Sequence, residues 1–168
     1  VDPSLNELLS KGGMASMLNT VWLIVTALSF GGVLERTGIL AHLLEAALKR
    51  VRSTGDLVLA TVTGGVVTNI LAADQFLAIA LPGRMFTVAF DERKLSRLNL
   101  SRSLEDSATL TSVLIPWNTC GAYMSATLGV MTLEYLPFAV FNYVCPLIAI
   151  VLGSLMIAQK PADNVAPA

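Results

Sequence analysis

Long apolar runs separated by short charged segments dominate the pattern of hydrophobic and polar positions along this chain. Residues 12–34 carry no charge, and about 20 predominantly apolar residues are what one helix needs to cross a bilayer. Residues 135–159 form a second long run, in which Pro137 and Pro146 are expected to kink the helix. The pattern predicts a membrane span in each run and a disordered tail at residues 160–168.

The first of these spans also carries small and polar residues. Thr26 and Ser29 lie along it, and the pair Gly31 and Gly32 near its end would let another helix approach closely. A span of this composition is expected to pack inside a helical bundle.

Residues 38–52 differ from both runs because charged positions recur on one side of a helix. Leu40, Leu44 and Leu48 share one face, whereas His42 and Lys49 lie on the other. The segment is too charged to span a membrane, and its basic end favours anionic headgroups. It is predicted to be an amphipathic helix that lies in the membrane interface.

Residues 57–83 are uncharged except for Asp74, but paired glycines and an asparagine near the centre weaken a helix there. Lys and Arg occur on both sides of the segment, so a single crossing would place one basic loop against the positive-inside bias. We therefore expect a re-entrant hairpin with Thr68 and Asn69 near its tip. A broken helix that crosses the membrane is the alternative.

Residues 103–133 form another interrupted run, and they follow a charged linker at residues 90–103 that is expected to be a solvated loop. Pro116, Asn118 and Gly121 interrupt the run in its middle. A helix broken at membrane depth is tolerated only where it is packed in protein or lines a hydrated cavity. The run is therefore predicted to be a broken helix, and its break is a candidate binding site.

Composition supports a membrane protein. Hydrophobic residues make up 54% of the 168 positions and charged residues only 14%, whereas a soluble domain carries close to a quarter charged residues. The net charge of -1 and the scattered Lys and Arg argue against a basic nucleic-acid-binding stripe, so no nucleic-acid partner is expected. Cys120 and Cys145 lack a CxxC spacing, and we interpret them as small buried hydrophobes.

These patterns together predict an all-α polytopic membrane protein, in which a transmembrane helix bundle contains discontinuous helices and a re-entrant hairpin. Residues 1–168 form a single membrane domain in this interpretation. The chain begins with Val1 and not with Met, so it is expected to be a fragment of a longer protein. The sequence contains no phosphate-binding loop, nucleophile elbow or zinc spacing, so we expect neither an enzyme nor a bound cofactor.

Two segments combine carboxylates with amides and hydroxyls inside the interrupted runs. Oxygen atoms of these kinds, together with backbone carbonyls, are the ligands that hard cations prefer. Broken helices add to them, since their ends point carbonyl dipoles toward a cation near the bilayer midplane. The predicted ion-binding or proton-binding residues are Thr68, Asn69, Asp74, Glu105, Asp106, Ser107, Thr109, Asn118 and Thr119.

Asp74 is the leading candidate for the ion carrier because it is the only charge in its run, and Asp106 is the second. Desolvation raises the pKa of a buried carboxyl, so such a group can take a proton when a cation leaves. Competition between an alkali cation and a proton at one site would give coupled exchange.

Structural roles compete with these assignments. Glu105 and Asp106 could begin a helix that Ser103 caps, whereas Asp74 has no such role in the predicted hairpin. Arg102 lies four residues before Asp106, and an ion pair between them would hold that carboxylate ionised. The Ser and Thr hydroxyls could simply donate to carbonyls of the preceding helical turn.

Three long strings resemble the NhaC family of sodium/proton antiporters. They are MLNTVWLIVTALSFGGVLERTGIL at residues 17–40, AADQFLAIALPGRMF at residues 72–86, and LSRSLEDSATLTSVLIPWNTCGAYMSATLGV at residues 100–130. The resemblance covers residues 17–153. It implies an inverted-repeat transporter of which this chain is the C-terminal half, and it supports Asp74, Glu105, Asp106, Asn118 and Thr119 as family features.

The resemblance also implies a substrate pair and a location. Sodium would leave and protons would enter across a bacterial inner membrane. The resemblance assigns no role to individual residues, and Asp74 and Asp106 are the sodium ligands expected from the residue pattern. The expected partners are the lipid bilayer, the missing N-terminal half and a second copy in a homo-oligomer. One rival is a sodium-coupled malate/lactate antiporter, which would need Arg84 or Arg102 near the site, and another is a truncated membrane scaffold without transport.

Overall fold

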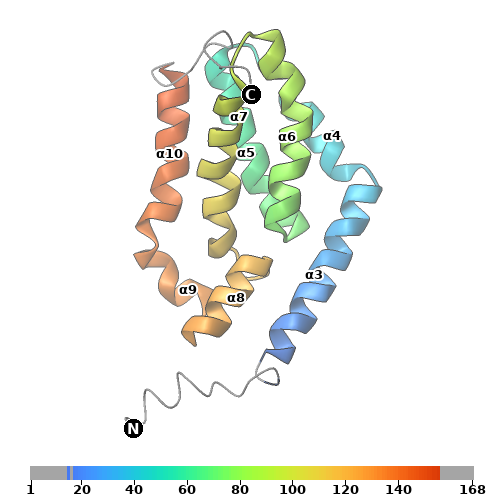
Figure 1. Cartoon of the computed structure of the whole chain (residues 1–168), viewed down its shortest axis with the longest axis vertical. Coiled ribbons are helices and arrows are strands. Elements are labelled where there is room, and N and C mark those ends of the chain that lie inside the picture. The colour runs from blue at the N-terminus through green and yellow to red at the C-terminus, as the bar shows by residue number, and fades with distance from the viewer. Residues whose placement is uncertain (1–14, 16, 156–168) are drawn as a thin grey trace.

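The computed structural model describes residue 15 and residues 17–155, which fold into a bundle of helices (Figure 1). The elements in chain order are α3 (Leu18–Arg36), α4 (Ile39–Leu48), α5 (Thr54–Ala72), α6 (Gln75–Glu92), α7 (Arg97–Leu104), the π-helical turn η1 (Glu105–Thr109), the 3₁₀ turn η2 (Ser112–Leu114), α8 (Thr119–Leu128), α9 (Thr132–Tyr135), the 3₁₀ turn η3 (Leu136–Phe138) and α10 (Val140–Ser154). By length and composition, α3 and α5 are each long and apolar enough to cross a membrane.

Helices α3 and α4 form one side of the bundle. They meet at Gly38, whose φ of 75° is in the left-handed region that glycine adopts without strain. Gly31 is the buried residue of α3, and a β-carbon at this position would collide with the carbonyl oxygen of Ala72 at the end of α5. The predicted close approach of a helix at Gly31 is therefore present.

Helices α5 and α6 form a hairpin, and Figure 1 shows α6 returning toward the end of the molecule where α5 begins. Ser53 and Asp56 form a capping box that starts α5. The turn lies at Ala73 and Asp74, where Ala73 adopts a left-handed φ of 57°. The predicted tip near Thr68 and Asn69 is wrong, because these residues continue α5.

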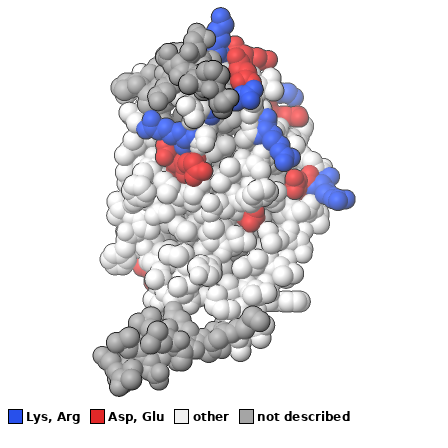
Figure 2. Space-filling model, viewed as in Figure 1, with Lys and Arg blue, Asp and Glu red and all other residues white. Residues whose placement is uncertain are grey.

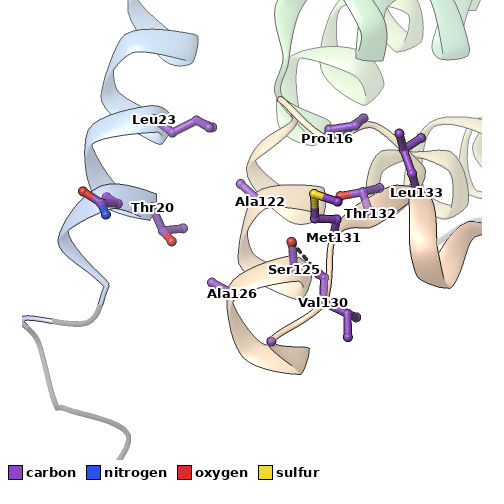
Figure 3. Close-up of a pocket in the computed structure, with 12 residues that line it drawn as sticks. Thr20, Leu23, Pro116, Ala122, Ser125, Ala126, Val130, Met131, Thr132 and Leu133 are labelled. Carbon is purple, nitrogen blue, oxygen red and sulfur yellow. Dashed lines mark hydrogen bonds between the residues drawn. The ribbon is translucent and has the colours of Figure 1, made fainter.

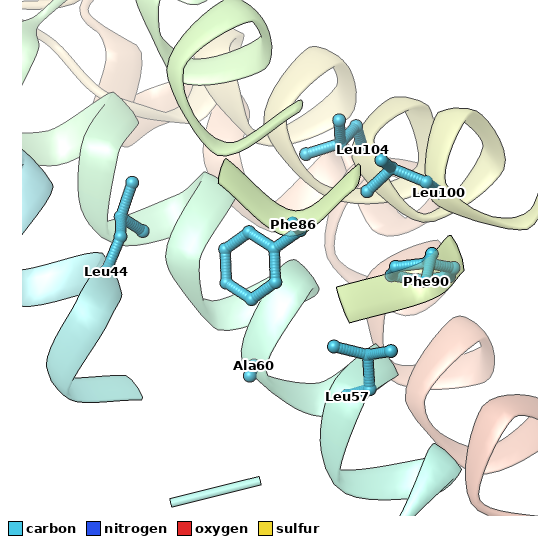
Figure 4. Packing of buried hydrophobic residues seen from close by; sticks show 7 residues of the cluster. All are labelled: Leu44, Leu57, Ala60, Phe86, Phe90, Leu100 and Leu104. Atoms are coloured by element: carbon cyan, nitrogen blue, oxygen red, sulfur yellow. The ribbon is translucent and has the colours of Figure 1, made fainter. Parts of the chain in front are cut away.

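The hairpin packs against α4 and α7 through a buried apolar cluster (Figure 4). Phe86 and Phe90 of α6 are fully buried in this cluster, between Leu57 of α5 and Leu100 of α7. Helix α6 also contains Pro82, whose missing N–H removes one helical hydrogen bond, yet the helix continues to Glu92. The cluster holds the hairpin in place beside the interrupted helix described next.

The segment predicted as a solvated loop at residues 90–103 is largely helical. Helix α6 runs to Glu92, and α7 begins at Arg97 after a Ser96 side chain that accepts a hydrogen bond from the Leu98 N–H. The linker prediction was wrong because apolar residues of α7 pack inward between its charged positions. Ser103 does not cap a helix at Glu105, since α7 passes directly into η1 there.

The final helices are bent. Helix α10 meets the preceding α9 and η3 pair at an angle of 60°, with the break at Ala139, and the two parts together could form one further span. Pro146 lies inside α10 without ending it. Residues 156–159 of the predicted last span lie outside the described residues, as do residues 12–14 and 16 of the first.

Charged side chains are distributed unevenly along the bundle. Figure 2 shows Lys and Arg on this face in the half of the molecule where α6 ends and α7 begins. Within residues 17–155, the last basic residue is Arg102, so α8, α9 and α10 carry none. The molecule therefore has one basic end and one end without basic groups among the described residues.

Candidate functional site

The two interruptions predicted from the sequence meet in space. The backbone N–H of Thr119, at the start of α8, donates to the Ala73 carbonyl oxygen in the hairpin turn at 3.0 Å. The Trp117 indole N–H donates to the Ile70 carbonyl oxygen at 2.8 Å. The break at residues 115–118 is therefore held against the end of α5 and the start of α6.

A pair of buried amides lies at the centre of this meeting point. The Nδ2 of Asn118 donates to the Oδ1 of Asn69 at 3.1 Å, and both side chains are fully buried. Asn69 in turn donates to the Ala108 carbonyl oxygen and to the Thr111 hydroxyl at 3.2 Å. Buried amides with partners on several segments fix one arrangement of those segments.

Side chains of three helices satisfy carbonyl groups of the irregular segment that runs from η1 into η2. Such irregular turns leave carbonyls without their usual helical partners, and a π-helical turn is often found at a functional site. The acceptor and donor pairs are Ala108 with Asn69, Leu110 with Asn142, and Val113 with Tyr135. The unwound helix is thus a built feature of the fold and not a loose end.

Asp74 lies in the hairpin turn and is half-buried. Its Oδ1 accepts a hydrogen bond from the Leu77 N–H at 3.0 Å, so it caps α6. The expectation that Asp74 has no capping role is wrong, because the tip lies at this residue and leaves the first N–H groups of α6 to be satisfied. Its Oδ2 accepts from the Thr119 hydroxyl at 3.5 Å, which joins the carboxylate to the second interruption.

Asn118 has the equivalent role for α8. Its Oδ1 accepts a hydrogen bond from the Cys120 N–H at 3.1 Å, while its Nδ2 contacts Asn69 as described above. The carboxylate of Asp74, the Thr119 hydroxyl and the two amide oxygens consequently lie along one connected chain of contacts. These oxygen types match the donor set that a hard cation takes.

The other hydroxyls in the predicted set bond within their own helix. Thr68 donates to the Gly64 carbonyl oxygen at 2.8 Å, and Ser107 donates to the Ser103 carbonyl oxygen at 2.7 Å. Thr109 donates to the Glu105 carboxylate at 2.7 Å on an exposed surface. The structure does not bring these three hydroxyls to Asp74, and their ligand roles stay predictions.

Asp106 is placed apart from the hairpin turn. Its carboxylate pairs with the Arg102 guanidinium at 3.6 Å, which is the ion pair that the spacing of the two residues predicted. The pair lines a small cavity together with Val58 of α5 and Gly153 of α10. Among the described residues, no three His, Cys, Asp or Glu side chains come together as a metal-binding group.

Three residues missed by the sequence analysis extend the contacts at the break. The Oε1 of Gln75 accepts from the Ser112 hydroxyl at 3.1 Å and from the Cys120 thiol at 2.9 Å. Cys120 is therefore a hydrogen-bonded group and not merely a small hydrophobe. Gln75 is the polar residue beside Asp74 in an otherwise apolar run, and that position was the signal that could have found it.

A cavity of about 520 Å³ opens beside the break, between α3 and the segment from α8 to α9 (Figure 3). Thr20 and Leu23 of α3 lie on one side, and Ala122 of α8 and Pro116 lie on the other. The described lining contains no charged side chain. The cavity therefore places an uncharged recess next to the residues that join the two interruptions.

The family model described as "Na+/H+ antiporter family" matches residues 2–156 of this chain. The chain belongs to the Na+/H+ antiporter family. No solved structure matches it. Membership in this family, together with the apolar helices, indicates a membrane protein.

Relatives in this antiporter family differ in what their names say they carry. The chain is 42% identical over 147 residues to the Na(+)/H(+) antiporter NhaC of Bacillus subtilis, which covers 88% of this chain and 32% of the relative. It is 38% identical to the arginine/ornithine antiporter ArcD of Halobacterium salinarum, over 88% of this chain and 30% of that protein. It is 36% identical to the malate-2H(+)/Na(+)-lactate antiporter of Bacillus subtilis, over 89% of this chain and 32% of that protein. The chain thus spans about a third of the length of these relatives.

Proposed function

We propose that this chain forms the ion-binding part of a secondary transporter that exchanges sodium ions for protons. The observation that carries the proposal is the meeting of two interrupted helices at Asn69, Asp74, Asn118 and Thr119. Relatives named as sodium/proton antiporters at 42% and 38% identity support sodium and protons as the exchanged ions.

The oxygens at the break suggest how exchange would work. A dehydrated sodium ion would take the Asp74 carboxylate, the Thr119 hydroxyl and amide or carbonyl oxygens of the two interruptions. When the ion leaves, a proton on the carboxylate would neutralise a charge that is expensive to expose to hydrocarbon. Asp106 is a second carboxylate that either ion could use, while Glu105, Ser107, Thr68 and Thr109 are further ligands only if the irregular helix rearranges.

Charge distribution suggests how the protein lies in its membrane. Basic residues favour the cytoplasmic side, so the basic end of the molecule, where α6 ends and α7 begins, would face the cytoplasm of a bacterial inner membrane. The chain would cross that membrane several times, surrounded by lipid and by the rest of a longer transporter, with a second copy as a further partner. It would act as a transporter without enzymatic activity and without a bound cofactor.

Proton flux in vesicles tests the proposal. The full-length transporter is reconstituted, sodium is added, and proton movement is followed with a pH-sensitive dye. We expect Asp74→Asn to abolish sodium-dependent proton release and Asp106→Asn to weaken it. Asp91→Asn is the matched control, because Asp91 is a carboxylate that pairs with Arg97 on the exposed basic end. Unchanged exchange in both site variants would contradict the proposed carriers.

An organic-acid antiporter remains the second candidate because of the malate/lactate relative. That function needs a cationic group near the bound substrate. Arg102 is paired with Asp106, and Arg84 lines a groove between α6 and α7 together with Glu105, so neither contacts Asp74. This placement favours sodium/proton exchange, and a requirement for malate or lactate in the flux assay would reverse the choice.

A further inference from the structure

Gln75 connects three separate segments with one uncharged side chain. It is the first residue of α6, yet its Oε1 accepts hydrogen bonds from the Ser112 hydroxyl of η2 at 3.1 Å and from the Cys120 thiol of α8 at 2.9 Å. Neither donor belongs to the hairpin. One amide therefore ties the start of α6 to both sides of the break.

The two donors lie on opposite sides of residues 115–118. Ser112 precedes the break, is fully buried, and also contacts the Thr109 carbonyl oxygen at 2.7 Å. Cys120 follows the break in the first turn of α8. A link between these two residues limits how far the ends of the break can separate.

The contacts of Gln75 run beside those of the proposed ion ligands. Asp74 contacts Thr119, and the next residue of each segment forms the next pair, Gln75 with Cys120. The Ala73 carbonyl oxygen accepts from the Thr119 N–H at 3.0 Å, which fixes the register between the two segments. A shift of Gln75 would therefore move the Asp74 carboxylate relative to the Thr119 hydroxyl.

We propose that Gln75 is a positioning residue for the transported cation. Its hydrogen bonds to Ser112 and Cys120 keep the Asp74 carboxylate at a fixed distance from the Thr119 hydroxyl. The uncharged amide does this without adding a charge to the site. This inference rests on the proposed function. Removing a group that orients the ligands of a metal ion typically lowers the affinity for that ion about 10-fold to 100-fold.

Cys120 supplies a direct measure of this role besides transport. Its thiol is half-buried and hydrogen-bonded to Gln75, so both the loss of the amide and the closing of the break around an ion should change its reactivity. The measurement is the rate at which N-ethylmaleimide alkylates the full-length transporter with Cys120 as its sole cysteine. Sodium chloride is titrated against choline chloride at constant ionic strength.

The expected results separate positioning from simple packing. Sodium slows alkylation in the parent, and Gln75→Leu raises the rate without sodium and raises the half-protecting sodium concentration about 10-fold. Gln75→Glu keeps an acceptor for both donors and restores the slow rate. Asn142→Leu is the matched control, because Asn142 holds the Leu110 carbonyl from α10 without bridging the break, and it leaves sodium protection unchanged.

Several outcomes would overturn the role. If Cys120 in Gln75→Leu is alkylated at the parent's rate and is protected by the same sodium concentration, positioning by Gln75 is contradicted. The same holds if Asn142→Leu shifts the half-protecting sodium concentration as much as Gln75→Leu does. If Gln75→Leu does not fold, Ser112→Ala removes one of the two donors, and an unchanged half-protecting concentration in that variant also contradicts it. A parent that exchanges sodium without protecting Cys120 overturns this inference alone, whereas a parent without sodium-dependent exchange contradicts the proposed function.

Discussion

Helices α3 and α5 have the same length of 19 residues and the same mean hydropathy of 1.4, but their surroundings are opposite. In an 18-residue apolar stretch of each helix, only 6% of α3 is buried inside the described fold, whereas 56% of α5 is buried. Hydropathy alone predicts a membrane span for each. The comparison shows that apolar composition determines whether a helix can enter a bilayer, and that other features determine whether it packs on protein.

Small and polar residues make the difference for α5, because they let neighbouring segments approach it closely. Gly64 and Gly65 leave room for Leu44 and Ser107, and Asn69 reaches the interrupted helix. Helix α3 has comparable residues, but Thr26 donates to carbonyls of its own backbone on an exposed surface. Gly31 is where α3 comes close to α5, whereas large apolar side chains elsewhere on α3, including Trp22 and Phe30, are exposed.

The largest expected effect comes from filling glycine positions in the two helices. A β-carbon at Gly65 would lie 2.9 Å from the Ser107 hydroxyl oxygen, whereas one at Gly32 would meet nothing within 4 Å. We expect Gly65→Val to lower the free energy of unfolding by about 3 kcal/mol through overpacking, and Gly32→Val to change it by less than about 0.5 kcal/mol. Unfolding of the full-length protein in detergent measures both, and equal losses would contradict the packing contrast.

The next largest effect compares an asparagine that contacts α5 with an asparagine that belongs to α3. Asn118 is buried and bonds to Asn69, which belongs to α5, whereas Asn19 of α3 is exposed beside the cavity. Asn118→Ala leaves the Asn69 oxygen without its donor and should cost about 2 kcal/mol of unfolding free energy, while Asn19→Ala should cost less than about 0.5 kcal/mol. A larger loss in the Asn19 variant would show that α3 is held by contacts outside the described fold.

The sequence could identify residues that meet at the break, because polar residues inside apolar runs are visible without a structure. Asn69, Asp74, Asn118 and Thr119 were found in this way, and the structure brings them together. Their mutual contacts were not predictable, since residues 45 or more positions apart meet only through the packing of the whole hairpin.

Two local errors have physical causes. The turn at Ala73 contains neither Gly nor Pro, so the usual signals for a left-handed residue were missing, and the tip was placed several residues too early. The charges around Arg97 suggested a solvated loop, whereas Leu100 and Leu104 bury the other face of α7 in the core. Spacing of apolar positions was a better guide there than charge count.

A third and smaller effect separates the two roles of Asp74 at the end of the α5 hairpin. The carboxylate caps α6 through the Leu77 N–H, and asparagine is an equally good cap. Asp74→Ala should therefore lower the unfolding free energy by about 1 kcal/mol, and Asp74→Asn by less than about 0.5 kcal/mol. Thermal unfolding of both variants checks this, and an equal loss in the two would mean that the charge itself stabilises the fold.

The smallest expected effect compares hydroxyls that donate within the two helices. Thr68 of α5 is buried and bonds to the Gly64 carbonyl oxygen, and Thr26 of α3 makes the same kind of bond on an exposed surface. Replacement by Val keeps the shape and removes the hydroxyl, so Thr68→Val should cost about 0.6 kcal/mol and Thr26→Val less than that. Both values come from unfolding of the full-length protein.

The Thr68 variant also sharpens the proposed ion site when it is compared with Thr119→Val. The Thr68 hydroxyl donates to the Gly64 carbonyl oxygen of its own helix and does not contact Asp74, so Thr68→Val should leave the sodium concentration for half-maximal exchange close to that of the parent. Thr119→Val removes the hydroxyl that contacts Asp74 and should raise that concentration. A rise in the Thr68 variant equal to that in the Thr119 variant would extend the site one turn further into α5, and would make the buried face of that helix part of the ion path.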